Sequence, residues 1–160
     1  MAANFFLKIG DISGEATQSG FDGQIEVLNY NWAVSQPGGF SYAGGGGVAQ
    51  ANIHDLTISF RMCSASPKFM EACASGKHFD DAVLTCLRAA GDQAEKYLEI
   101  TLTDVMIASY QTGAGGDEFP VETIGLNFAQ IKEEYFKQND QGVAESAGSG
   151  QWNQLTSSTS

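Results

Sequence analysis

The sequence predicts a mainly β protein with one short α-helix, and three observations lead to this fold class. The first is an alternation of apolar and polar side chains, with a period of two residues, along several segments. The second is a single segment with the end signals of a helix. The third is a set of glycine-rich stretches without periodicity between the expected strands. Each alternating segment has one apolar and one polar face, which is typical of antiparallel sheets that are wetted on one side.

The clearest strands are expected at residues 52–62 and 97–106. In the first segment, Leu56 and Phe60 fall on the apolar face and Ser59 on the polar face. The second segment alternates in the same way, so each strand is expected to bury one face only. Shorter strands are expected at residues 4–9, 24–34, 79–88 and around Trp152.

The segment 121–136 alternates as well, but its apolar positions change phase. Ile124 and Phe128 belong to one alternating set, whereas Ile131 and Tyr135 belong to the other. An extra residue in a strand turns all later side chains to the opposite face. We therefore expect a β-bulge between Phe128 and Ile131.

The segment 66–76 is the one expected helix. Ser66 is a favoured residue for the N-cap, Pro67 for the first helical position, and Gly76 for the position just past the end. The apolar side chains of the segment form a stripe that should pack on a sheet or across a barrel mouth, and they are Phe69, Met70 and Cys73.

Three stretches lack periodicity and are expected to be loops. The longest runs from Ser35 to Ala49, and the others cover residues 112–119 and 138–150. A long connection without structure of its own inside a compact domain is usually functional or mobile. The first loop is therefore a candidate for binding or assembly.

The length of 160 residues predicts one domain, residues 1–160. The 19 acidic and 8 basic residues give a net charge of −11, which argues against nucleic-acid binding and against docking on an anionic membrane. No apolar run approaches the ~20 residues that a membrane-spanning helix needs. The first residues show no basic leader, so we expect synthesis in the cytoplasm without a signal peptide.

Motifs for catalysis or metal binding are weak, and we expect neither an enzyme nor a metal or other cofactor. Neighbours on a strand, such as His54 and Asp55, point to opposite faces and cannot share a metal ion. The pair His78 and Asp80 lacks an obvious third ligand. Cys73 lies on the apolar stripe of the helix, where a thiol is buried and inert. The three cysteines, Cys63, Cys73 and Cys86, are predicted to be free, since they are few, odd in number and without a CxxC pair.

Nearly the whole chain resembles the hemolysin-coregulated protein (Hcp) family, the tube subunits of type VI secretion systems. The resemblance follows the right order and close to the right spacing along the chain. The matching residues are Phe6 to Glu15, Ile25 to Leu28, Trp32, the Gly44–Gly47 loop, Asp55-Leu56, Ala72 to His78, Tyr97 to Leu102, Leu126 to Gln130 and Trp152-Asn153.

The resemblance implies an antiparallel β-barrel of two packed sheets with one short helix, assembled as a hexameric ring around a wide channel. Such rings stack into a tube that a contractile machine expels, and the channel can hold effector proteins. The implied partners are further copies of the chain, the spike, sheath and baseplate proteins, and effectors. The implied destination is the medium or a target cell. The Ser/Thr-rich tail after Trp152 departs from the family's pattern.

Two sets of residues are candidates for these roles. Asn29 and Asn31 interrupt an apolar segment and share one face two residues apart, so they are expected to line the channel, with bulk solvent outside the ring as the alternative. The loop from Ser35 to Ala49 is expected to carry contacts between rings through Phe40, Tyr42 and the glycines Gly44, Gly45, Gly46 and Gly47.

Two other functions fit the residues less well. A cytoplasmic ligand-binding β-barrel would need an apolar pocket inside the monomer and would be monomeric. A zinc or thiol hydrolase would depend on His78 and Cys73 alone.

Overall fold

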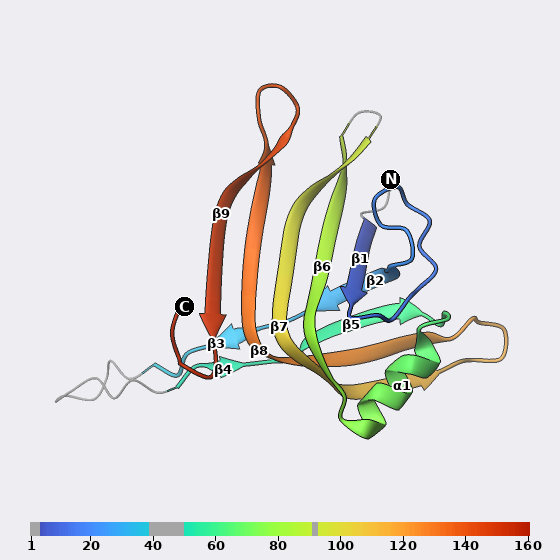
Figure 1. The fold of residues 1–160 in the computed structure, drawn as a ribbon. Coiled ribbons are helices and arrows are strands. Elements are labelled where there is room, and N and C mark those ends of the chain that lie inside the picture. The colour runs from blue at the N-terminus through green and yellow to red at the C-terminus, as the bar shows by residue number, and fades with distance from the viewer. Residues whose placement is uncertain (1–3, 39–49, 91–92) are drawn as a thin grey trace.

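The computed structural model describes residues 4–38, 50–90 and 93–160, and within these ranges the chain is mostly strand, with one helix. Figure 1 shows the arrangement. The elements are β1 (Asn4–Ile9), β2 (Ile25–Asn31), β3 (Val34–Ser35), β4 (Asn52–Ile53), β5 (Leu56–Arg61), α1 (Ser66–Ser75), β6 (His78–Ala90), β7 (Gln93–Gly113), β8 (Val121–Gln138) and β9 (Ala144–Asn153).

The main sheet closes on itself as an antiparallel barrel. Its strand order is β5-β2-β1-β6-β7-β8-β9, and an additional pairing of β5 with β8 closes the ring of strands. β9 lies outside the closed ring and extends the sheet beside β8, while β3 and β4 form a separate small sheet (Figure 1). The predicted antiparallel β-barrel with one short helix is thus confirmed, and its packed layers are parts of one continuous sheet.

The barrel interior is filled by the apolar positions of the alternating strands. Burying one such side chain contributes about 1.5–3 kcal/mol, so this interior is the main source of stability. The helix covers part of it, because the ring of Phe69 packs edge-on against Phe60 with the centroids 5.4 Å apart. The largest fully buried side chains are Leu7, Ile9, Ile25, Leu56, Ile58, Phe60, Phe69, Leu84, Ile100, Leu102, Ile107 and Ile124.

The helix begins one residue earlier than predicted. Ala65 occupies the N-cap and Ser66 is the first helical residue, with its hydroxyl accepting a hydrogen bond of 3.0 Å from the Cys63 amide. Gly76 ends the helix in the left-handed region at φ 68°, as glycine at this position commonly does. The predicted stripe is wrong at Met70, whose side chain is 51% exposed. Ser66 and Ala72 are buried beside Phe69 instead.

The predicted bulge in β8 is also wrong. Phe128 and Ile131 are both buried, but the register between β7 and β8 is continuous at these residues. Tyr135, expected to point inward, is 47% exposed. The phase changes where β8 changes partner: it pairs with β5 up to Leu126 and with β9 from Gln130 onward. The strand bends sharply between these two pairings (Figure 1).

Several other boundaries differ from the prediction. The stretch 138–150, expected to be a loop, contains most of β9, which pairs with β8 from Ala144 to Asn153. The strand expected at 97–106 is twice as long in the structure, and the segments 24–34 and 52–62 are each divided into two strands. Residues 39–49 of the longest expected loop lie outside the described ranges.

Candidate functional site

One outer surface of the barrel carries neutral residues, all of them polar except one glycine, in regular rows across four neighbouring strands, β2, β5, β8 and β7. Paired residues on adjacent antiparallel strands project from the same face, so the register defines these rows. One row is Asn31, Thr57, Gly125 and Ser109, and the other is Asn29, Ser59, Thr123 and Gln111. We call these eight residues the polar face.

The polar face exists because the same strands bury their other side. Ile58 and Ile124, which alternate with residues of the polar face, are fully buried in the barrel. Within the face, the hydroxyls of Ser59 and Thr123 are hydrogen-bonded at 3.2 Å. A Cβ at Gly125 would come within 2.6 Å of the Ser109 hydroxyl, so glycine lets these strands approach closely. The surface therefore offers hydroxyl and amide groups without charge.

The two asparagines lie on this face because of a β-bulge in β2. The register between β2 and β5 shifts between Val27 and Asn29, which leaves Leu28 as the extra residue. Beyond the shift, Tyr30 points toward the core, where its ring meets Phe5 edge-on at 5.4 Å. Asn29 and Asn31 are consequently both exposed on the outer side, as the sequence predicted for a shared face.

A buried carboxylate lies behind the polar face and was missed by the sequence analysis. Glu122 is fully buried, and Tyr110 donates a hydrogen bond to its Oε2. Its Oε1 has no hydrogen-bond partner in the described part of the chain. Burial, together with the hydrogen bond to Glu122, raises the pKa of Tyr110 to about 12. The sequence did carry a signal for this buried carboxylate, because Glu122 occupies an inward-facing position of the same alternation as Ile124.

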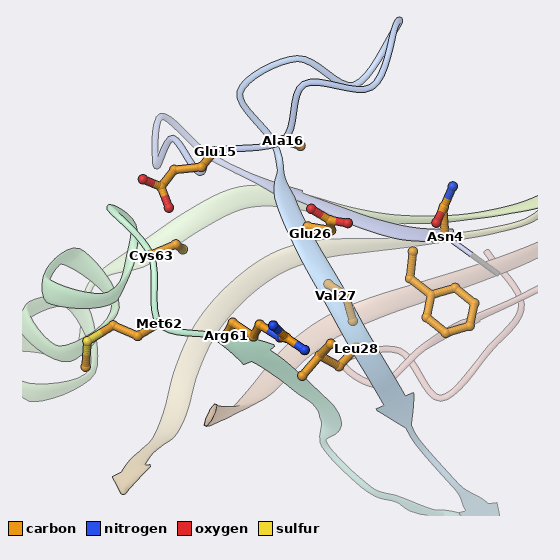
Figure 2. A pocket seen from close by; sticks show the side chains of 10 residues that line it. Asn4, Glu15, Ala16, Glu26, Val27, Leu28, Arg61, Met62 and Cys63 are labelled. Atoms are coloured by element: carbon orange, nitrogen blue, oxygen red, sulfur yellow. The ribbon is translucent and has the colours of Figure 1, made fainter. Parts of the chain in front are cut away.

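A pocket of about 400 Å³ opens where β2 and β5 diverge, next to the end of the polar face (Figure 2). Val27 and Phe5 contribute its apolar part, and Glu15 and Glu26 contribute carboxylates. Figure 2 shows the Arg61 side chain extending toward Leu28. Within residues 4–38, 50–90 and 93–160, no carboxylate forms an ion pair with Arg61.

His78, which the sequence analysis considered for metal or thiol chemistry, lies in an exposed ion pair. His78 pairs with Asp104 through Nδ1 at 3.2 Å, and both side chains are more than half exposed. No cluster of three or more His, Cys, Asp or Glu side chains that could hold a metal ion occurs among the described residues. Cys63, Cys73 and Cys86 are free, and burial raises the pKa of the Cys86 thiol to about 11, which keeps it neutral and unreactive.

In the described ranges, no helix has the length and hydrophobicity needed to cross a membrane.

Comparison with known proteins assigns this architecture to a family. Residues 6–135 match the family model described as "Type VI secretion system effector, Hcp". The chain belongs to the Hcp family. Protein hcp1 of Pseudomonas aeruginosa is 38% identical over 144 residues, which are 89% of each chain.

Solved structures of type VI secretion proteins share the fold over nearly the whole chain. A type six secretion system protein superposes with a TM-score of 0.87 at 27% identity, covering 98% of this chain and 99% of the other. Hcp1 from Salmonella typhimurium superposes with a TM-score of 0.77 at 29% identity, covering 99% of both chains. The predicted family is therefore confirmed.

The predicted site residues of this Hcp protein fall into two groups. Asn29 and Asn31 are brought together with the polar residues of β5, β8 and β7, which the sequence analysis had not joined to them. The expected stacking residues lie outside the described ranges, and they are Phe40, Tyr42, Gly44, Gly45, Gly46 and Gly47. Their role stays a prediction.

Proposed function

We propose that this Hcp protein is the subunit of a closed ring whose polar face lines a central channel, and that such rings stack into a tube. One observation carries the proposal. The four strands of the polar face form a sheet whose two outermost strands, β2 and β7, each have an edge without a strand partner in the described part of the chain. Such edges are a template for pairing with another chain.

The two edges follow from the register. β1 pairs with β2 only from Ile25 to Val27, so residues 28–31 have no described strand partner on that side. β6 pairs with β7 only as far as Met106, so residues 107–113 are paired on the β8 side alone. The edges lie at opposite borders of the same polar sheet.

Strand direction supports ring closure through these edges. β2, β5, β8 and β7 are antiparallel in succession, so β2 and β7 run in opposite directions. Rotation about an axis along the strands places β2 of the next copy beside β7 in antiparallel orientation. Each contact uses two different edges, and a heterologous contact of this kind generates a ring when the rotation closes. Six copies are expected from the family resemblance.

The chemistry of the channel lining supports a role in carrying other proteins. A lining of hydroxyls and amides without charges can hydrogen-bond to varied polypeptide surfaces, which suits a carrier of effector proteins. We propose that Asn29 and Asn31 line the channel. We also propose that the protein has a structural rather than a catalytic role. The tube would be assembled inside a sheath, joined to a spike and baseplate, and expelled from the cytoplasm.

The decisive experiment is the oligomeric state of the purified protein. Native mass spectrometry and negative-stain electron microscopy should show a closed ring, with six copies as the expected number. A species of 17.0 kDa alone at micromolar concentration would contradict the proposal and would favour the ligand-binding barrel. That alternative has less support, because Phe60, Leu84 and the other core side chains occupy the barrel interior.

A further inference from the structure

Asp55 places a carboxylate at one border of the otherwise neutral polar face. It directly precedes β5 and alternates with Thr57 and Ser59, so the three side chains project from the same side of the strand. A Cβ at Gly125, a residue of the polar face, would lie 3.6 Å from the Oδ2 atom of Asp55. Because glycine has no side chain, nothing on Gly125 covers this carboxylate, and Asp55 remains partly exposed.

The carboxylate has one oxygen held in place and one oxygen available to a ligand. The side-chain amide of Asn127 donates a hydrogen bond of 2.9 Å to Asp55 Oδ1. Within the described ranges, no hydrogen bond or ion pair occupies Oδ2. A carboxylate accepts the strongest hydrogen bonds from ammonium and guanidinium groups. Asp55 is therefore oriented on the face but lacks the cationic partner that suits it.

The two ends of β5 differ in their charge. At the far end, Arg61 lines a pocket together with Glu15 and Glu26, so groups of both signs are mixed there (Figure 2). Beside Asp55, by contrast, Asn127 and its strand partner Met106 are neutral. The Asp55 end of the polar face therefore presents negative charge alone.

We infer that the polar face takes a protein cargo with lysine or arginine side chains on its surface, and that Asp55 is the residue that selects it. The inference rests on the proposed ring, in which every copy places its Asp55 at the same height in the channel. We call these carboxylates the acidic belt. Charge complementarity favours a basic cargo at the belt and repels an acidic one.

The spacing of the belt suits a small folded domain. Each copy contributes the four strands of the polar face, so the carboxylates of neighbouring copies are about 19 Å apart around the channel. A domain about 20 Å across can reach two of them at once. Each exposed ion pair is weak, but contacts made together add up, so the cargo is held and can still be released.

The test measures retention of one small helical domain by purified rings. The domain is made in two forms, with lysines or with glutamates at the same surface positions. Unmodified rings should retain the lysine form about tenfold better at low ionic strength, and salt should reduce this difference. Asp55→Asn rings should lose about tenfold in retention of the lysine form, since the contacts that add up are removed. Asp55→Lys rings should prefer the glutamate form.

Asp140→Asn is the matched control. Asp140 is exposed in the turn between β8 and β9, which projects away from β5 (Figure 1), and its substitution changes the net charge by the same amount as Asp55→Asn. Retention of the lysine form by this control should stay within about twofold of the parent protein. Asp55→Asn keeps a side-chain oxygen for Asn127, so it preserves the hydrogen bond on the face.

Cross-linking locates the contact without any substitution. A zero-length carbodiimide condenses a carboxylate with a nearby amine and forms an amide bond. In unmodified rings loaded with the lysine form, mass spectrometry should identify a link between Asp55 and a lysine of the domain. The same treatment of Asp55→Asn rings should give no link at this position.

The outcomes separate the inference from the proposed function. Intact rings that retain both forms equally would overturn the inference, as would an Asp140→Asn loss equal to that of Asp55→Asn, or the absence of any link to Asp55. The ring itself would stand in each of these cases. Absence of a ring in the unmodified protein would instead overturn the proposed function.

Discussion

Tyr110 donates a hydrogen bond to Glu122 across the β7–β8 pair, and Glu122 is the one fully buried charged side chain among the described residues. Thr112 is the strand neighbour of Glu122, so the tyrosine reaches the carboxylate diagonally from two residues away. A buried polar group is costly unless it is paired, and the other carboxylate oxygen of Glu122 has no described partner. The stability of this end of the barrel therefore depends on the tyrosine.

A double-mutant cycle tests this dependence. Tyr110→Phe should lower the free energy of unfolding by about 1–3 kcal/mol, because it leaves Glu122 buried without its donor. The double variant Tyr110→Phe with Glu122→Leu should recover most of the loss, since removing both polar partners leaves nothing unsatisfied. Denaturant unfolding at fixed protein concentration measures the free energy of unfolding of both variants and of the parent protein. Equal stability of Tyr110→Phe and the parent protein would contradict this account.

The buried phenols also predict that the stability of the fold decreases at alkaline pH. Burial raises the pKa of Tyr30 and of Tyr110 from 10.0 to about 12. A group with a raised folded pKa contributes stability that is fully present below its unfolded pKa and is lost as the pH rises through the folded value. Stability should therefore fall between about pH 10 and pH 12.

The tyrosinate absorbance gives the matching measurement. In the folded protein the last tyrosines should ionise near pH 12, and Tyr110→Phe should remove one of these late steps. Ionisation of all the tyrosines near pH 10 while the fold is intact would show that the phenols are hydrated.

The strands could be predicted where burial imposes a period of two residues. Leu56, Ile58 and Phe60 are all fully buried, and the polar residues between them form part of the polar face. In β9 the same reasoning fails, because almost every side chain from Glu145 to Gln151 is exposed and small, so no alternation appears. Backbone pairing with β8, which the sequence does not reveal, creates that strand.

The candidate site was predicted only in part for a similar reason. Asn29 and Asn31 stood out as polar residues in an apolar segment, and their shared face is what the structure shows. Their neighbours Thr123 and Gln111 come from strands far away in the sequence and join them only through the barrel register. Sequence patterns establish which residues face outward, whereas the closure of the barrel decides which of them meet.

Asp104 supplies a test of how the long strands bend. It lies in β7 with a φ of 54°, a conformation that side chains other than glycine, asparagine and aspartate rarely adopt. Its neighbours Thr103 and Val105 pair with Gln130 and Phe128, where β8 changes partner. The unusual backbone therefore sits at the bend of both strands.

We expect Asp104→Gly and Asp104→Asn to keep the stability within about 0.5 kcal/mol, since both residues tolerate a positive φ. Asp104→Val should cost about 1–3 kcal/mol through strain at this position. The exposed pair with His78 contributes little, so His78→Ala should be nearly neutral and separates the two effects. If valine is tolerated as well as glycine, the bend does not depend on this conformation.

The proposed channel position of Asn31 can be tested with a large side chain that projects from the polar face. Asn31→Trp should leave the ring mass unchanged, because Asn31 is exposed on the outer side of β2. Six indoles would narrow the channel and replace amides that can hydrogen-bond to cargo, so retention of a co-expressed effector should fall several-fold. Ser149→Trp, on the exposed strand β9 away from the polar face, is the matched control and should retain the effector. Equal retention by both variants, with intact rings, would place Asn31 outside the channel.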